Sequence, residues 1–239
     1  MPLSFQQRHA LKQRFYPTAD DVTVGVMRGA LERHLQPGAR VLDAGSSGGT
    51  WVLKRYAAEM GLVVGVDVAL PQGLDDAHWA EPVVGDLATL PFAGASFDAI
   101  LCYNVIEHLV DPAAAFAEFA RLLRPGGALI FKTPAFCSPV ILLSRALPLS
   151  AHRLFKGPLG VEAADVFPTH YRCNTRPKLH RALSAAGLHR ELLTAVDQTY
   201  DYLYFSQVPF VLGLLYSRLL DRPGLSRFRN AIIGVYIKP

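Results

Sequence analysis

The chain has 239 residues, 51% of them hydrophobic, which is enough to bury the core of a single α/β domain. Its 24 Lys and Arg against 20 Asp and Glu give a net charge of +4. These charges are spread along the chain, which excludes a basic tail and specifies no anionic partner. Cys102, Cys137 and Cys173 are odd in number and lack the close pairs of zinc sites, so we expect thiols in a reducing compartment.

No targeting or spanning segment is apparent. The first residues, Met1 to His9, lack a basic region followed by an apolar core and a cleavage site, so a cytoplasmic location is expected. No uninterrupted apolar run reaches the roughly 18 residues that a spanning helix needs. Peripheral membrane contact stays open because the composition is apolar for a soluble enzyme.

Two helices are predicted first, over Leu3–Phe15 and Asp21–Leu35, outside the core fold and packed over the site or an edge. From Ala39 onward, short apolar runs alternate with helical patterns, which indicates a mainly parallel sheet with helices on both faces. The five strands predicted in this part are Arg40–Asp43, Leu62–Asp67, Pro82–Val84, Asp98–Tyr103 and Ala128–Lys132.

Turn and cap residues place the helices between these strands. The segment Gly49–Met60 is predicted to be helical, and so is Pro112–Leu123 with Asp111 as its N-cap.

Later in the chain, Asn174 or Thr175 is expected to cap a helix that has Pro177 in its first turn and ends at Gly187. Two late strands follow, Leu188–Val196 and Ala231–Ile237.

The segment Val41–Thr50 is an apolar strand, a loop of small residues and the start of a helix. Glycine is needed where the backbone turns sharply or a ligand approaches it closely, so this is a candidate nucleotide loop. The dinucleotide pattern G-x-G-x-x-G fails, because counting from Gly45 places Ser47 and Thr50 at its second and third glycines. This weakens an NAD-binding interpretation.

The loop resembles the first motif of class I S-adenosylmethionine methyltransferases, D-x-G-x-G-x-G, at Asp43, Gly45 and Gly49, with Ser47 replacing the middle glycine. The resemblance implies a Rossmann-like sheet of seven mainly parallel strands, the last of them antiparallel. It also implies that the loop backbone holds the methionine part of S-adenosylmethionine and that Asp43 helps to hold its amino group.

Further cofactor residues follow the next two strands. Asp67 ends the second strand, where an acid can accept hydrogen bonds from both ribose hydroxyls, and Val68 lies beside it. The segment with Asp86 and Leu87 resembles the third-strand motif of the family, which implies that the acid meets the adenine amino group and that the next backbone lies near the ring.

The segments Leu90–Pro112 and Leu123–Ala128 give the most specific match. They resemble the small-molecule methyltransferases that include the ubiquinone-pathway enzymes, and the whole resemblance covers roughly residues 39 to 133. Ligands of such sheets lie at the carboxyl ends of the strands, which places Asn104, Glu107 and His108 at the site.

His108 is the best candidate for a general base, because its reference pKa lies near neutrality; the alternative is a histidine that caps or packs the next turn. His170 and Tyr171 are expected on the acceptor side. The related O-methyltransferases associate a motif E-x-x-E-H with a divalent metal, but Asn104 stands where its first carboxylate would be. We therefore expect no metal site.

We expect one methyltransferase domain over residues 1–239, with an N-terminal helical segment (1–38) and substrate-side insertions at 134–172 and 197–230. Parts of these insertions, Phe136–Gly157 and Tyr200–Leu220, are more apolar than a solvent loop. They are candidates for a lid over an apolar pocket, a surface resting on lipid, a dimer interface or core.

The sequence therefore predicts transfer of a methyl group from S-adenosylmethionine to a small, apolar, lipid-like or quinone-like acceptor, most simply by O-methylation. Two alternatives stay open, an NAD-dependent oxidoreductase and a non-catalytic cofactor-binding protein. Nucleic acid is a poor fit, since strand four ends in Cys102-Tyr103-Asn104-Val105, which lacks the motifs of base methylation. The oligomeric state is left open.

Overall fold

The computed structural model describes residues 2–47, 49–69, 79–139, 141–142 and 168–239. Its centre is a seven-stranded sheet in the order β3-β2-β1-β4-β5-β7-β6. The strands are β1 (Arg40–Ala44), β2 (Leu62–Asp67), β3 (Glu81–Val84), β4 (Phe97–Tyr103), β5 (Leu123–Pro134), β6 (His189–Val196) and β7 (Ala231–Ile237).

Strands β1 to β5 pair in parallel, and β7 runs antiparallel between β5 and β6. The antiparallel direction of β7 is visible in its hydrogen bonds. Near its end the Gly126 amide donates to the Lys238 carbonyl at 2.8 Å, and before its start the Ala135 amide donates to the Asn230 carbonyl at 2.9 Å. The predicted Rossmann-like sheet with an antiparallel last strand is confirmed.

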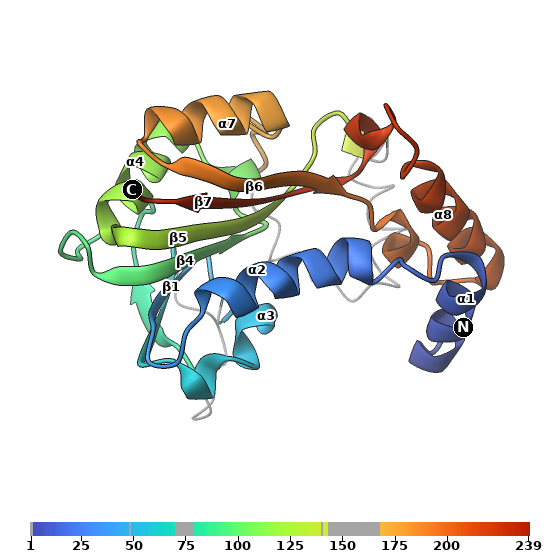
Figure 1. Cartoon of the computed structure of the whole chain (residues 1–239), viewed down its shortest axis with the longest axis horizontal. Helices are drawn as coiled ribbons and strands as arrows, with labels where there is room; N and C mark the ends of the chain where they lie inside the picture. Colours follow the sequence, from blue (N-terminus) through green and yellow to red (C-terminus); the bar gives the residue numbers. More distant parts are fainter. Residues whose placement is uncertain (1, 48, 70–78, 140, 143–167) are drawn as a thin grey trace. The chain divides into compact units, whose positions relative to one another are not determined.

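Both faces of the sheet are covered, which explains why its central strands are apolar throughout rather than alternating. Helices α4 (Pro112–Leu122) and α7 (Arg176–Ala185) cover one face, and α2 (Val26–His34) and α3 (Trp51–Lys54) lie on the other (Figure 1). All residues of β1 except Arg40 are buried.

The caps behave largely as predicted. The Asp111 carboxylate accepts hydrogen bonds from the Ala113 and Ala114 amides, and Pro112 occupies the first turn of α4. Thr175 is the N-cap of α7, without a side-chain hydrogen bond to the helix. Asn174, the other candidate cap, uses its side chain elsewhere, as described below.

Three elements differ from the prediction by more than two residues at one end. The segment predicted as one helix over Gly49–Met60 is α3 followed by a 3₁₀ turn, because Leu53 is the one buried residue of these two elements and little packing favours a longer α-helix. The N-terminal part of Asp21–Leu35 is a π-turn ahead of α2. Strand β5 starts at Leu123 rather than Ala128, because Leu123 already pairs with β4 ahead of a register shift.

The chain divides into two compact units. The sheet unit comprises Met27–Thr133, Thr169–Thr194 and Ile233–Pro239, and the helical unit comprises Met1–Val26, Pro134–Pro168 and Ala195–Ile232. Most of the insertion Phe136–Gly157 lies outside the described residues.

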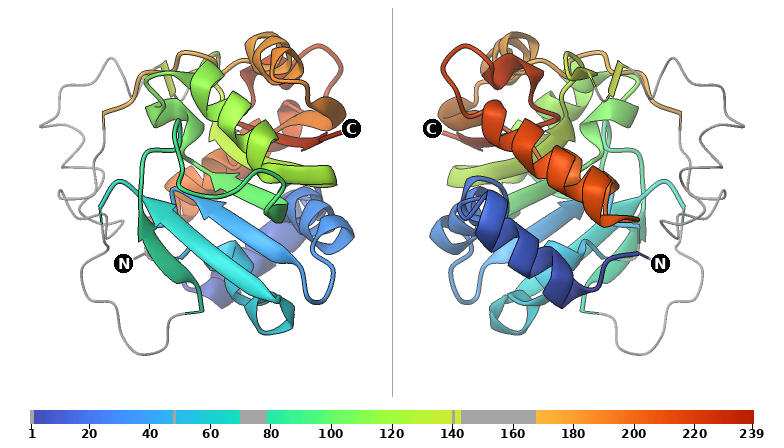
Figure 2. Two further views of the ribbon diagram at one scale, coloured as in Figure 1. Left: turned by 90° about the vertical axis from the view of Figure 1, so that its left-hand side faces the viewer. Right: turned by 90° about the vertical axis from the view of Figure 1, so that its right-hand side faces the viewer.

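In the helical unit, α1 (Phe5–Phe15) and α8 (Gln207–Leu219) lie side by side (Figure 2). Ser4 begins α1 with a capping box closed by Gln7. The helical unit has its own small core, formed by Tyr16, Ala19, Tyr200, Phe210 and Leu214.

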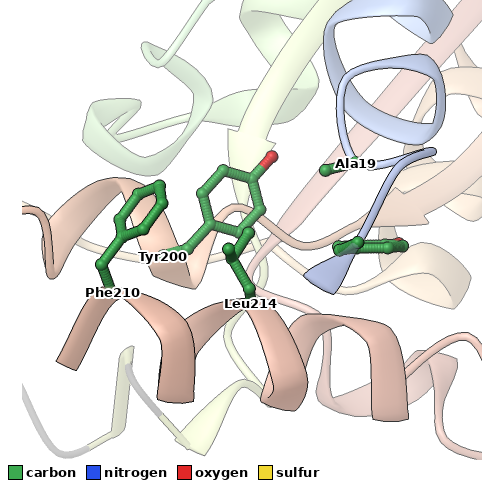
Figure 3. Packing of buried hydrophobic residues seen from close by; sticks show 5 residues of the cluster. Ala19, Tyr200, Phe210 and Leu214 are labelled. Atoms are coloured by element: carbon green, nitrogen blue, oxygen red, sulfur yellow. The ribbon is translucent and has the colours of Figure 1, made fainter. Parts of the chain in front are cut away.

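The ring of Tyr200 is central to this core and stands beside Phe210 and Leu214 of α8 (Figure 3). It packs edge-on against Phe210 with 5.9 Å between the ring centroids. The predicted apolar segment Tyr200–Leu220 is thus partly core, since Tyr200, Phe210 and Leu214 are fully buried.

Candidate functional site

The carboxyl ends of β1, β2, β3 and β4 lie at one edge of the sheet because these strands run in parallel, and this edge is where sheets of this class hold ligands. Every residue that the sequence predicts for the site belongs to the sheet unit, and most follow one of these four strands.

The loop after β1 folds back onto the end of β2. The amides of Gly45 and Ser46 both donate to the Val66 carbonyl, at 2.8 and 3.0 Å, and the Gly49 amide donates to the Ser46 carbonyl at 2.8 Å. Gly45 and Gly49 have φ angles of +76° and +113°. These left-handed values favour glycine, and Ser47 adopts a positive φ of 43° between them.

Neighbouring side chains also require these two glycines. A Cβ on Gly45 would lie 2.3 Å from Cγ2 of Val105, and a Cβ on Gly49 would lie 2.5 Å from the Trp79 ring. Neither Val105 nor Trp79 is predicted from the sequence to belong to the site, because their contacts with the loop depend on tertiary packing.

Asp43 lies beneath the loop. Its two carboxylate oxygens accept hydrogen bonds from the Thr50 amide at 2.7 Å and the Thr50 hydroxyl at 2.6 Å, and its side chain is fully buried. Burial raises the pKa of Asp43 to about 6. In this arrangement Asp43 fastens the start of the following helix to the end of β1, so its contact with a cofactor amino group stays a prediction.

Asp67 connects the loop to the end of β2. One carboxylate oxygen accepts the Ser47 amide at 2.8 Å and the other accepts the Val68 amide at 2.7 Å. A carboxylate offers about four acceptor positions, and the residue is only partly buried. Asp67 therefore keeps acceptor capacity for a ligand beside the glycine loop, and the Val68 side chain next to it is exposed.

The other predicted cofactor residues are at turns after β3 and β4. Asp86 is exposed and its carboxylate accepts the Ala88 amide at 2.9 Å, whereas Leu87 is buried. Asn104 is exposed with a positive φ of 57°, and its amide donates to the Lys132 carbonyl at 2.8 Å. The chain thus turns sharply after β4 while staying attached to β5.

Glu107 organises the site beyond β4. It is 4% exposed, and its carboxylate accepts the Thr133 hydroxyl at 2.9 Å, which itself accepts the Asn174 side-chain amide at 2.6 Å. The Glu107 backbone carbonyl accepts the amides of His170 and Tyr171, at 2.7 and 3.1 Å. Glu107 therefore joins the ends of β4 and β5 to the segment that precedes α7.

The three predicted catalytic residues thus come together around Glu107. Nε2 of His108 lies 4.0 Å from a Glu107 carboxylate oxygen, and the His108 side chain is partly exposed. Burial raises the pKa of Glu107, and the neighbouring His108 opposes this rise. Thr133 and Asn174, which support Glu107, were not predicted to belong to the site, although Thr133 lies near the end of β5 at the same sheet edge.

Among the described residues, no group of three or more His, Cys, Asp or Glu side chains is arranged to hold a metal ion. None of the helices in the described part of the chain is long and apolar enough to cross a membrane. Cys102 and Cys173 are buried free thiols, and Cys137 is an exposed one.

Comparison with known proteins agrees with this geometry. Residues 42–131, which run from β1 to β5 and include the loop, Asp67 and Glu107, match the family model of the methyltransferase domain. These residues form a class I methyltransferase domain.

The methyltransferase domain has curated relatives at moderate identity. The ubiquinone biosynthesis O-methyltransferase of Hahella chejuensis is 36% identical over 113 residues, which cover 43% of this chain and 46% of that protein. The enzyme of the same name from Xanthomonas oryzae pv. oryzae is 36% identical over 134 residues, covering 48% and 54%. The chain thus spans about half the length of the curated relatives that it matches.

Solved structures share the fold across the whole chain. The geranyl diphosphate C-methyltransferase from Streptomyces coelicolor A3(2) superposes with a TM-score of 0.60 at 15% identity, covering 100% of this chain and 88% of that one. The [4+2]-cyclase SpnF superposes with a TM-score of 0.55 at 19% identity, covering 100% and 98%. At these identities the likeness describes the fold and leaves the reaction open.

Proposed function

We propose that this protein transfers a methyl group from S-adenosylmethionine to a small-molecule acceptor. The observation that supports this most directly is the Asp67 carboxylate, hydrogen-bonded to the Ser47 amide of the glycine loop within the methyltransferase domain. An acid at the end of the second strand, beside a glycine loop that follows the first, suits a ligand with a ribose and a charged tail.

The residues present fit this cofactor. Asp67 has acceptor positions for two ribose hydroxyls, and the positive φ angles of Gly45 and Gly49 keep side-chain bulk away from the loop backbone. Asp86, Leu87 and Asn104 follow the next two strands, where an adenine ring and its ribose would extend. When bound, S-adenosylmethionine supplies a methyl group activated by its sulfonium.

The finer proposal is O-methylation with His108 as the general base. With S-adenosylmethionine bound, the acceptor oxygen would displace S-adenosylhomocysteine from the methyl carbon as the carbon–sulfur bond breaks. The hydroxyl proton would pass to the His108 imidazole, and the nearby Glu107 carboxylate would stabilise the resulting charge. Holding the acceptor in line contributes the larger part of the rate, on the order of 7 to 11 kcal/mol for good alignment.

An apolar acceptor of lipid-like or quinone-like chemistry is the class that we propose. The relatives named ubiquinone biosynthesis O-methyltransferases support it, although they align over only part of this chain. His170 and Tyr171, held by the Glu107 carbonyl, are proposed to contact the acceptor.

Two alternatives compete with this function. An NAD-dependent oxidoreductase is disfavoured because Ser47 and Thr50 stand where the dinucleotide pattern needs glycine. A protein that binds the cofactor without methyl transfer is a stronger competitor, since a [4+2]-cyclase shares this fold.

Calorimetry with S-adenosylmethionine, S-adenosylhomocysteine and NAD separates these functions. We expect both adenosyl ligands to bind and NAD to give no binding heat. Binding of NAD without binding of either adenosyl ligand would overturn the proposal. Mass spectrometry then tests for methylated products of quinone-like and phenolic acceptors. If the adenosyl ligands bind but no acceptor is methylated, the non-catalytic alternative is favoured.

Asp67→Ala is the sharpest variant for this assay. Hydrogen bonds to a charged acceptor contribute about 1.5 to 3 kcal/mol each, so S-adenosylhomocysteine affinity should fall at least about tenfold. Glu191→Ala is a matched control, because it removes a partly exposed carboxylate of the same unit that pairs with Arg33 and His34 instead. Unchanged affinity in folded Asp67→Ala would remove Asp67 from the site.

A further inference from the structure

Helix α8 of the helical unit is apolar on two opposite faces. Phe210, Gly213, Leu214 and Ser217 are buried, and Phe210 and Leu214 belong to the small core around Tyr200. On the other face, Val208, Leu212, Leu215 and Leu219 are 67%, 60%, 44% and 43% exposed. We refer to these four exposed residues as the apolar stripe.

The spacing of the apolar stripe is that of a continuous helix face. Residues three and four apart lie above one another on an α-helix, and the four positions follow at intervals of four, three and four. Isolated exposed leucines are ordinary, but aligned ones form a patch that usually marks an interaction surface. The opposite face of α8 packs into the small core, which leaves the apolar stripe exposed.

Helix α1 lies beside α8 (Figure 2). The Arg218 side chain of α8 donates to the Phe15 carbonyl at the end of α1, at 3.1 Å, and the guanidinium of Arg8 lies 5.0 Å above the Tyr204 ring. These contacts fix α1 against the helical unit. Phe5 at the start of α1 is 76% exposed and adds a further apolar side chain.

The charge of the two helices is positive throughout. Arg8, Lys12 and Arg14 lie on α1 and Arg218 lies on α8, and neither helix contains an Asp or Glu. Arg222 and Arg227 follow α8 and are exposed.

Two of the nearby acids are held by partners. Asp20 pairs with Lys12 at 2.7 Å, and Asp221 pairs with Arg229 at 2.6 Å and accepts the Tyr16 hydroxyl. The charges of Lys12 and Asp20 cancel, so the excess of positive charge on the two helices comes from Arg8, Arg14 and Arg218.

We propose that the apolar stripe of α8, together with the basic helix α1, docks onto an anionic lipid bilayer. Amphipathic helices with cationic flanks lie in the plane of the interface, where apolar side chains enter the acyl boundary and cations meet anionic headgroups. At 13 residues, α8 is too short to span the roughly 30 Å of a bilayer core, so it lies on the surface.

The charge favours a bilayer over a second copy of the chain. A symmetric dimer through the apolar stripe would bring two surfaces of the same positive sign together, which opposes association. An anionic membrane has the complementary sign. This inference concerns the helical unit and does not depend on the proposed methyl transfer.

Flotation of the full chain with vesicles tests the proposal. We expect binding to vesicles that contain phosphatidylglycerol, weaker binding to pure phosphatidylcholine, and loss of binding as salt rises. Leu212→Glu places a charge in the stripe at a solvent-exposed position and should lower the partition coefficient at least about tenfold. Arg14→Gln should weaken binding to the anionic vesicles only.

Val110→Glu is the matched control, since Val110 is 61% exposed, like Leu212, but lies in the sheet unit. It should bind vesicles like the wild type. Circular dichroism and thermal unfolding establish that each variant is folded.

Absence of vesicle binding by the wild type, or equal binding by folded Leu212→Glu, would overturn the proposal. Light scattering measures the oligomeric state. If the wild type is a dimer that does not bind lipid, and Leu212→Glu converts it to a monomer, the apolar stripe contacts a second copy of the chain instead.

Discussion

Gly45→Ala tests the packing of the site most directly. Alanine at a φ of +76° costs about 1 to 2 kcal/mol, because its Cβ approaches the following carbonyl. Its Cβ would also lie 2.3 and 2.9 Å from Cγ2 and Cγ1 of Val105, and such overpacking costs about 1 to 3 kcal/mol. We therefore expect Gly45→Ala to lower the free energy of unfolding by about 2 to 5 kcal/mol.

Val105→Ala should partly rescue this variant. It removes both Cγ atoms and leaves the Val105 Cβ 3.2 Å from the new methyl group, a contact that a small shift relieves. A double-mutant cycle should give a coupling of about 1 to 3 kcal/mol, while the conformational cost at position 45 persists.

Urea unfolding followed by tryptophan fluorescence suits this measurement, because both tryptophans, Trp51 and Trp79, belong to the sheet unit. If the two changes were additive within about 0.3 to 0.5 kcal/mol, the contact between Gly45 and Val105 would be refuted.

Two further predictions concern titration and catalysis. Burial raises the pKa of Asp43 to about 6, so Asp43 stays protonated in the folded state at pH values where it ionises in the unfolded chain. The free energy of unfolding should therefore fall by about 3 kcal/mol as the pH rises from about 4 to 6, and then level off. Asp43→Asn should remove this slope from urea titrations at several pH values, and an unchanged slope would contradict the assignment. His108→Gln should keep S-adenosylmethionine affinity while lowering turnover about 10² to 10⁴-fold, with His189→Gln as an exposed control. A wild-type rate would leave His108 as a packing residue.

The sheet was predictable because its signal is local. Apolar runs that end in Asp43 and Asp67, with glycines, prolines and capping residues between them, specify the strands and the helix starts. Element lengths were less predictable where tertiary contacts decide them. Strand β5 gains its first residues from pairing with β4, and α3 stops early because only Leu53 is buried there.

The candidate site also has residues that the local sequence predicts and contacts that only the tertiary structure reveals. Asp67, Asp86 and Asn104 follow strand ends and were predicted from position and resemblance. The connection from Glu107 through Thr133 to Asn174 joins three distant segments, and no spacing in the sequence indicates it. Glu107 itself was expected at the site from topology, but its role as the group that positions His170 and Tyr171 emerges only from its backbone contacts.

The glycine loop shows why a motif alone does not establish a ligand. In the sequence, Gly45 and Gly49 indicate a backbone that a cofactor approaches, yet in the structure each is already required by a side chain of the protein, Val105 and Trp79. A loop built only for packing would need the same glycines. Asp67 differs, because its bonds to the Ser47 and Val68 amides leave acceptor positions on a partly exposed carboxylate, and the packing of the loop does not require these. Asp67→Ala therefore tests cofactor binding, whereas Gly45→Ala tests the fold that supports it.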